Sequence, residues 1–184
     1  MFTNILLHTC CAPCATYTLE HLRKEGAEVS AFWFNPNIHP LGEYQKRRQT
    51  LRSFSLLKGL PLIESPVYDS ESYFNSVVGK KEPRCENCLY LRLSKTAETA
   101  FKGGFKAYST TLLISPYQKH ELIKEIGEHV GKEKKVEFYY EDLRPGYYES
   151  RKISRDMNLY RQKYCGCIYS QMESYRPIML TKRV

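Results

Sequence analysis

The chain alternates short apolar runs with longer amphipathic stretches, several of which end at a glycine. Strands buried on both faces of a parallel sheet read as near-continuous apolar runs, and the helices between them cover the sheet. The predicted strands are residues 4–9, 28–34, 60–64, 106–114 and 135–140. The predicted helices are residues 14–25, 42–58, 70–78, 86–102, 118–130 and 147–161.

This order predicts a single-domain α/β fold over residues 1–184. We expect a Rossmann-like (HUP-like) parallel sheet of about five strands with helices on both faces. A domain of this length buries roughly 70% of its unfolded surface and needs no disulfide for stability. Residues 171–184 are expected to form a basic C-terminal tail. In such sheets ligands bind beyond the carboxyl ends of the strands, so functional residues are expected directly after a strand.

The composition argues against a membrane-spanning or secreted protein and makes nucleic acid a candidate partner. No apolar run approaches the ~20 residues that span a bilayer, and the first residues do not resemble a signal peptide. We therefore expect a cytoplasmic protein without membrane contact. The net charge is +8 and there are 15 tyrosines. A basic surface attracts polyanions and aromatic rings stack on unpaired bases, which makes nucleic acid a candidate partner. Half-buried core packing is an equal explanation for the tyrosines.

Seven cysteines, an odd number, carry the strongest chemical signal. In a reducing compartment clustered thiols indicate metal binding or catalysis. Cys10, Cys11 and Cys14 follow the first predicted strand, and Cys85 and Cys88 open the helix at 86–102. Two Cys-x-x-Cys pairs plus Cys10 exceed the four ligands of a structural zinc site, and iron–sulfur clusters take four thiolates in most cases. This favours an iron–sulfur centre, with zinc as the alternative.

The pair Cys165-Gly-Cys167 differs from the other cysteines in its spacing. A disulfide between them would close a very small ring, and a strained disulfide is easily reduced. Gly166 would relieve the backbone. We therefore predict a redox-active pair, and the alternative is that both thiols are further metal ligands. The loop after the first strand also lacks the glycine-rich phosphate-binding motifs of nucleotide-binding α/β proteins.

Four motifs taken together resemble the epoxyqueuosine reductases of the QueH type. The resemblance runs from residue 5 to about residue 170. The motifs are His-Thr-Cys-Cys-Ala-Pro-Cys at 8–14, Arg-Cys-Glu-Asn-Cys at 84–88, Ser-Thr-Thr-Leu-Leu-Ile-Ser-Pro at 109–116 and Tyr-Arg-Gln-Lys-Tyr-Cys-Gly-Cys at 160–167.

The resemblance implies an oxidoreductase that deoxygenates epoxyqueuosine to queuosine at the wobble position of tRNA, with electrons from an unidentified donor. It also implies a 4Fe-4S cluster and an additional mononuclear iron. By position, the cluster ligands would be Cys10, Cys11, Cys85 and Cys88. Cys165 and Cys167 would form the redox-active disulfide, and Cys14 would be a ligand of the additional iron.

The motifs assign neither the proton donor nor the residues that contact tRNA phosphates. The candidate proton donors are His8, Tyr147 and Asp142, which lie near predicted strand ends. The predicted helix at 42–58 is basic enough to contact tRNA phosphates, although a solvated face explains it equally. Its cations are Lys46, Arg47, Arg48 and Arg52, and weaker candidates near other loops are Arg84, Lys119, Arg144 and Arg151.

Two rival functions remain at this point. One is a tRNA-modifying sulfur transferase or ATP-pyrophosphatase-like enzyme with a structural zinc, which the missing phosphate loop argues against. The other is a non-enzymatic RNA-binding module stabilised by zinc. Analysis of bound iron, sulfide and zinc separates both from an iron–sulfur reductase.

Overall fold

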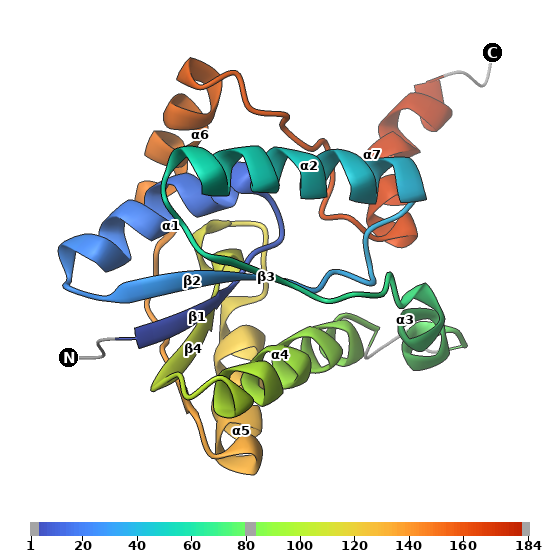
Figure 1. The fold of residues 1–184 in the computed structure, drawn as a ribbon. Coiled ribbons are helices and arrows are strands. Elements are labelled where there is room, and N and C mark those ends of the chain that lie inside the picture. Colours follow the sequence, from blue (N-terminus) through green and yellow to red (C-terminus); the bar gives the residue numbers. More distant parts are fainter. Residues whose placement is uncertain (1–3, 80–83, 182–184) are drawn as a thin grey trace.

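The computed structural model describes residues 4–79 and 84–181, with side chains described as far as Tyr175. These residues form one sheet of five parallel strands in the order β3-β2-β1-β4-β5 (Figure 1). The strands are β1 (Asn4–His8), β2 (Glu28–Trp33), β3 (Leu62–Glu64), β4 (Ala107–Thr110) and β5 (Glu137–Phe138). The parallel α/β sheet expected from the apolar runs is therefore confirmed.

Helices cover both faces of the sheet. The helices are α1 (Ala12–Lys24), α2 (Leu41–Leu57), α3 (Ser70–Val77), α4 (Arg84–Lys102), α5 (His120–Lys134), α6 (Tyr147–Asp156) and α7 (Ile168–Thr181). Helices α1 and α2 pack on one face, and α4 and α5 pack on the other (Figure 1). Helix α6 packs against α1. None of the described helices is long and apolar enough to cross a bilayer.

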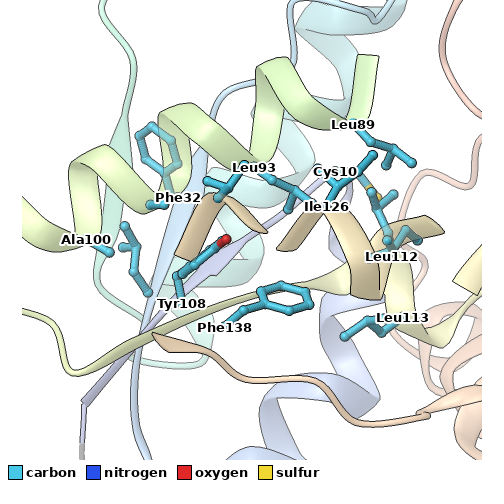
Figure 2. Packing of buried hydrophobic residues seen from close by; sticks show 14 of the residues in the cluster. Cys10, Phe32, Leu89, Leu93, Ala100, Tyr108, Leu112, Leu113, Ile126 and Phe138 are labelled. Carbon is cyan, nitrogen blue, oxygen red and sulfur yellow. The ribbon is translucent and has the colours of Figure 1, made fainter. Parts of the chain in front are cut away.

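The central strand β1 supplies both halves of the core because its side chains alternate between faces. Ile5 and Leu7 join the cluster under α1 and α2, whereas Leu6 joins the cluster under α4 and α5. Figure 2 shows the second cluster, in which Tyr108 of β4 and Phe138 of β5 pack beneath α4 and α5. Cys10 lies at the margin of this cluster and is only 7% exposed. The start of the functional site is thus anchored in the core.

Two predicted strands keep fewer than half of their expected residues in the structure. Strand β4 ends at Thr110, and residues Thr111–Ile114 form a 3-10 turn instead. The Thr110 side chain accepts a hydrogen bond from the backbone N–H of Leu112 and so caps this turn. Strand β5 pairs only with β4 and keeps two residues. Both segments are apolar because they are buried, and their apolar runs therefore resemble longer strands.

Two helices end differently from the prediction. Helix α5 continues through Gly131, where a Cβ atom would lie 2.8 Å from the carbonyl of Val136. This glycine therefore permits close packing and does not stop the helix. Helix α6 ends at Asp156, short of the expected residue 161. Helix α7 covers most of the segment expected to be a C-terminal tail, of which residues 182–184 lie outside the described part.

Candidate active site and metal-binding centre

A triad of cysteines lies where β1 passes into α1, at the carboxyl edge of the sheet. The Sγ atoms of Cys10, Cys11 and Cys14 all lie within 4.8 Å of one another, and those of Cys10 and Cys11 are 3.8 Å apart. Cys11 is the extended residue before α1, and Pro13 lies in the first turn of the helix, where its missing N–H costs no hydrogen bond. Metal–sulfur bonds of about 2.3 Å place two ligands of a tetrahedral ion about 3.8 Å apart. The triad can therefore hold a metal.

Of the three thiols of the triad, that of Cys10 loses its proton most readily. Hydrogen bonds from the Cys11 and Cys14 thiols hold the pKa of Cys10 well below its usual value. Burial raises the pKa of Cys11, and the hydrogen bond to Cys10 raises that of Cys14. Metal binding would displace the remaining thiol protons, as it does at thiolate sites generally.

Two polar side chains orient these sulfurs. The Thr111 hydroxyl accepts from the Cys10 backbone N–H at 3.2 Å and lies 3.5 Å from Cys10 Sγ, to which it can donate. Gln162 Nε2 donates to Cys11 Sγ at 2.9 Å and lies 4.0 Å from Cys14 Sγ. Gln162 Oε1 is buried and has no hydrogen-bond partner among the described residues. Such outer contacts fix ligand geometry in metal sites.

The other four cysteines gather around a neighbouring cavity of about 350 Å³. Cys85 and Cys88 lie at the start of α4, and Cys165 and Cys167 lie in the segment before α7. All four line this cavity, and every cysteine of the chain is a free thiol in the structure. The buried Tyr73 lies beside Cys167 and Cys88. The structure thus places the Cys-Gly-Cys pair next to the second Cys-x-x-Cys pair.

Arg47 of α2 holds the segment that carries the Cys-Gly-Cys pair. Its guanidinium donates to the carbonyls of Cys165 at 2.9 Å and of Tyr164 at 3.0 Å, and to Glu43 Oε1 at 2.7 Å. Arg47 is 1% exposed and Glu43 is 9% exposed. The Tyr160 hydroxyl donates to the second oxygen of Glu43. A buried ion pair with three further hydrogen bonds therefore anchors the segment to α2.

Gly166 has a backbone conformation that other residues rarely adopt. Its φ is +145°, and a Cβ atom would lie 3.1 Å from Ile38 and 3.3 Å from Asn37. The carbonyl of Gly166 accepts from the N–H of His39 at 2.8 Å. The following residue, Cys167, precedes α7 and its Sγ accepts from the N–H of Ser170 at 3.3 Å. Both the turn and the sulfur after it are fixed by the backbone.

A buried cation lies among the sulfurs. Arg92 of α4 is 3% exposed, and no carboxylate pairs with it among the described residues. Burial acts to lower the pKa of Arg92, but the sulfurs of Cys88, Cys165 and Cys10 raise it overall. Burial also raises the pKa of Cys88 to about 11, and the charge of Arg92 opposes this rise. A buried cation without a carboxylate favours negative charge on the surrounding sulfurs or on a group that they bind.

A second cavity, of about 600 Å³, connects the two groups of cysteines. Cys10 and Cys14 line one part of it and Cys165 lines another. Tyr117, Gln118 and Cys165 line both cavities. Gln118 Nε2 donates to Cys165 Sγ at 3.5 Å. Thiols from both groups therefore face a connected space large enough for a nucleobase.

Comparison with known proteins identifies the family. A family model described as "Epoxyqueuosine reductase QueH" matches residues 5–173. A relative with this name from Dehalococcoides mccartyi is 42% identical over 175 residues, which is 95% of this chain and 96% of that protein. The chain belongs to the QueH family. A second member, from Thermotoga maritima, is 35% identical over 181 residues and covers 92% of this chain and 91% of its own.

A solved structure that resembles the chain supports the fold alone. It is titled "The crystal structure of predicted subunit of tRNA methyltransferase from Methanocaldococcus jannaschii DSM". Its TM-score is 0.54 at 11% sequence identity, and the match covers 83% of this chain and 74% of that one. The α/β architecture of this QueH family member therefore recurs in a chain of very different sequence.

Two of the three proton-donor candidates are unsuited to this role in the structure. His8 is fully buried, and its ring lies 2.9 Å from Thr110 Oγ1 and 3.2 Å from the Phe34 carbonyl. Burial lowers its pKa to about 4, so the ring is neutral and its hydrogen bonds are internal. Hydrogen bonds from Arg144 lower the pKa of Asp142 to about 2, which leaves an ionised carboxylate. Tyr147 is half-buried and lines the larger cavity, as a proton donor there must.

The predicted phosphate contacts on α2 are contradicted by the structure for Arg47, which is buried as described above. Arg48 and Arg52 both bind the Glu64 carboxylate of β3, at 2.8 and 2.7 Å. Arg48 and Arg52 share this one carboxylate, so only one of their two positive charges is compensated. Arg84, a weaker candidate, likewise pairs with Glu173 at 3.0 Å.

Some functional contacts could not be found from cysteine spacing. Thr111 and Gln162 lie inside two of the motifs, yet nothing in the motifs indicates that they contact sulfur. The signal for Arg92 was present, because residues 85, 88 and 92 share one face of a helix. That spacing places a cation beside both cysteines of α4 and could have identified it.

Proposed function

We propose that this chain removes the epoxide oxygen of epoxyqueuosine at the wobble position of tRNA in the cytoplasm. Membership of the QueH family over nearly the whole chain carries the proposal. The relatives are named for this reductase activity. Six of the seven free thiols line two connected cavities and provide redox groups of the kind that such a reaction needs.

The chemistry requires two electrons and two protons. They convert the epoxide to an alkene and release its oxygen as water. Oxidation of the Cys165 and Cys167 thiols to a disulfide supplies both the electrons and the protons, and an external donor then reduces the disulfide. The Gly166 backbone conformation and the Arg47 anchor support this assignment, because they hold the pair in a defined turn beside the cavities.

We assign the metal centre to the remaining cysteines. Cys10, Cys11, Cys85 and Cys88 would hold a 4Fe-4S cluster, and Cys14 would bind an additional iron. Soft thiolate ligands suit iron–sulfur chemistry. The closeness of Cys14 to Cys10 and Cys11 supports a shared metal environment for these three. When bound, the centre supplies electron transfer and a Lewis acid for the departing oxygen.

The chain's own side chains would prepare the site. Burial raises the pKa of Tyr147, so its hydroxyl stays protonated and can donate to the departing oxygen, after which it regains a proton that the thiol pair releases. Gln118 donates a hydrogen bond to the sulfur of Cys165. Gln162 steadies Cys11 and presents its unpartnered Oε1 within a buried part of the site. The two glutamines position the sulfurs without being redox-active themselves.

Metal analysis and turnover test the proposal together. Protein purified without oxygen is expected to be brown and to contain about four sulfides, as one 4Fe-4S cluster requires. With a chemical reductant it should convert epoxyqueuosine tRNA to queuosine tRNA. The variant Cys165→Ser is expected to lose turnover and to keep its iron and sulfide. A colourless zinc protein without turnover would contradict the proposal, and full turnover by Cys165→Ser would remove the disulfide from it.

A further inference from the structure

An aromatic and cationic surface lies at the entrance to the larger cavity. We define it by three tyrosines and five cations, and call it the α6 surface. Its residues are Tyr117, Tyr147, Tyr148, Arg151, Lys152, Arg155, Arg161 and Lys163. An open depression of about 800 Å³ runs over this surface and shares Tyr117, Tyr147 and Arg151 with the cavity that contains Cys10 and Cys165. The depression is therefore continuous with the cavity of the cysteine site, and a molecule bound in it can reach the thiols.

The three tyrosines form a connected array. The rings of Tyr117 and Tyr147 are edge to face with centroids 6.0 Å apart, and those of Tyr147 and Tyr148 are 5.6 Å apart. Tyr117 and Tyr148 are each 82% exposed. Large exposed aromatic rings are unusual for a surface that only faces water, and such rings stack on unpaired bases.

The cations here differ from the other arginines of the chain. Among the arginines whose side chains are described, three donate to no carboxylate or carbonyl, and all three line the depression or the cavity. They are Arg151, Arg155 and Arg161. The exposed Lys152 and Lys163 add two more charges, against the carboxylates of Glu149 and Asp156. The surface is therefore cationic overall.

We infer that the α6 surface binds the single-stranded anticodon loop of tRNA and directs the wobble base into the cavity of Cys10 and Cys165. This inference rests on the proposed function and adds where the substrate binds. Arg151 and Arg155 contact loop phosphates, and Tyr117 stacks on a base at the cavity entrance. Unpaired loop bases are accessible to aromatic side chains in a way that paired bases are not. By contrast, Arg47 of α2 is buried in an ion pair, and Arg48 and Arg52 are both engaged with Glu64.

Binding of epoxyqueuosine tRNA at several salt concentrations tests the charge contribution. The double variant Arg151→Glu, Arg155→Glu is expected to bind on the order of tenfold more weakly at 0.1 M salt, with a shallower salt dependence. The matched control, Lys106→Glu with Lys132→Glu, has the same charge change but lies outside both cavities, with Lys106 directly before β4. The control should bind like wild type. Equal binding by the Arg151 and Arg155 variant and by the control would overturn the inference.

Tyr117 tests the stacking contribution. Tyr117→Ala is expected to weaken binding about 5- to 150-fold, the range found for base–aromatic stacking. Tyr117→Phe keeps the ring and should bind like wild type. If Tyr117→Ala binds the tRNA as well as Tyr117→Phe does, the inference that Tyr117 stacks on a base is wrong. A wild-type protein that converts the tRNA while every surface variant binds normally would refute the surface and leave the proposed function intact. A wild-type protein that neither binds nor converts it would refute both.

Discussion

Replacing Arg47 by methionine should be far more damaging than the same change at the adjacent Arg48. Methionine keeps much of the side-chain length and removes the charge and every donor. At residue 47 the change leaves the Glu43 carboxylate, which is 9% exposed, with only the Tyr160 hydroxyl. It also removes the donor to the carbonyls of Tyr164 and Cys165.

The magnitude follows from burial. Removing one partner of a buried ion pair costs roughly 3–5 kcal/mol, because the remaining charge stays buried without compensation. The side chains of Arg48 and Glu64 are 31% and 20% exposed, and Glu64 retains Arg52 when Arg48 is replaced. A pair near the surface contributes about 0–1 kcal/mol. Arg48→Met is thus a matched control from the same helix, and the two variants should differ by at least about 2 kcal/mol.

Urea unfolding of the reduced, metal-free protein, followed by circular dichroism, measures this difference. Adding Glu43→Gln to Arg47→Met should recover part of the lost stability, because it removes the uncompensated carboxylate. Hydrogen exchange should also accelerate at the amide of His39, which donates to Gly166 next to the released segment. Free energies of unfolding within about 1 kcal/mol for the two methionine variants would refute this interpretation of Arg47.

Three further substitutions test other parts of the site. Gly166→Ala should lower the free energy of unfolding by about 1–3 kcal/mol because residue 166 has a positive φ. The control Gly42→Ala should be neutral or stabilising, because the added Cβ atom would have no described neighbour within 4 Å. Equal stabilities would contradict the strain assigned to the turn. Gln162→Leu should reduce metal affinity about 10- to 100-fold through the lost hydrogen bond to Cys11, as measured by competition with a chelator. Arg92→Met should lower the midpoint potential of the bound centre in a redox titration, because a buried positive charge favours the reduced form, and an unchanged potential would exclude this role.

The fold was largely accessible from the sequence because buried parallel strands leave a strong apolar signal. The places where the prediction differed are places where side-chain or edge effects decide. Thr110 caps a turn and shortens its strand, and Gly131 packs against a carbonyl inside a helix that it was expected to end. The assignment of residues 1–184 to a single domain stays a prediction.

The site was predictable in position but less so in detail. The cysteine triad follows β1, as expected because ligands bind beyond the carboxyl ends of parallel strands. The division of the seven sulfurs among cluster, iron and disulfide stays a prediction. Arg47 was wrongly predicted to contact tRNA phosphates, because a charged residue on a helix is usually exposed to solvent. The Glu43–Arg47 spacing of four residues was visible, but its burial against Cys165 depends on a segment 118 residues away.

A single-turnover reaction tests the central claim most directly. Fully reduced protein, freed of excess reductant, is mixed with epoxyqueuosine tRNA without oxygen and quenched with a thiol-alkylating reagent. Mass spectrometry then counts queuosine in the tRNA and the alkylated thiols of Cys165 and Cys167 in the same sample. We predict queuosine together with a matching amount of the Cys165–Cys167 disulfide. Absence of queuosine, or queuosine with both thiols fully alkylated, would contradict the claim.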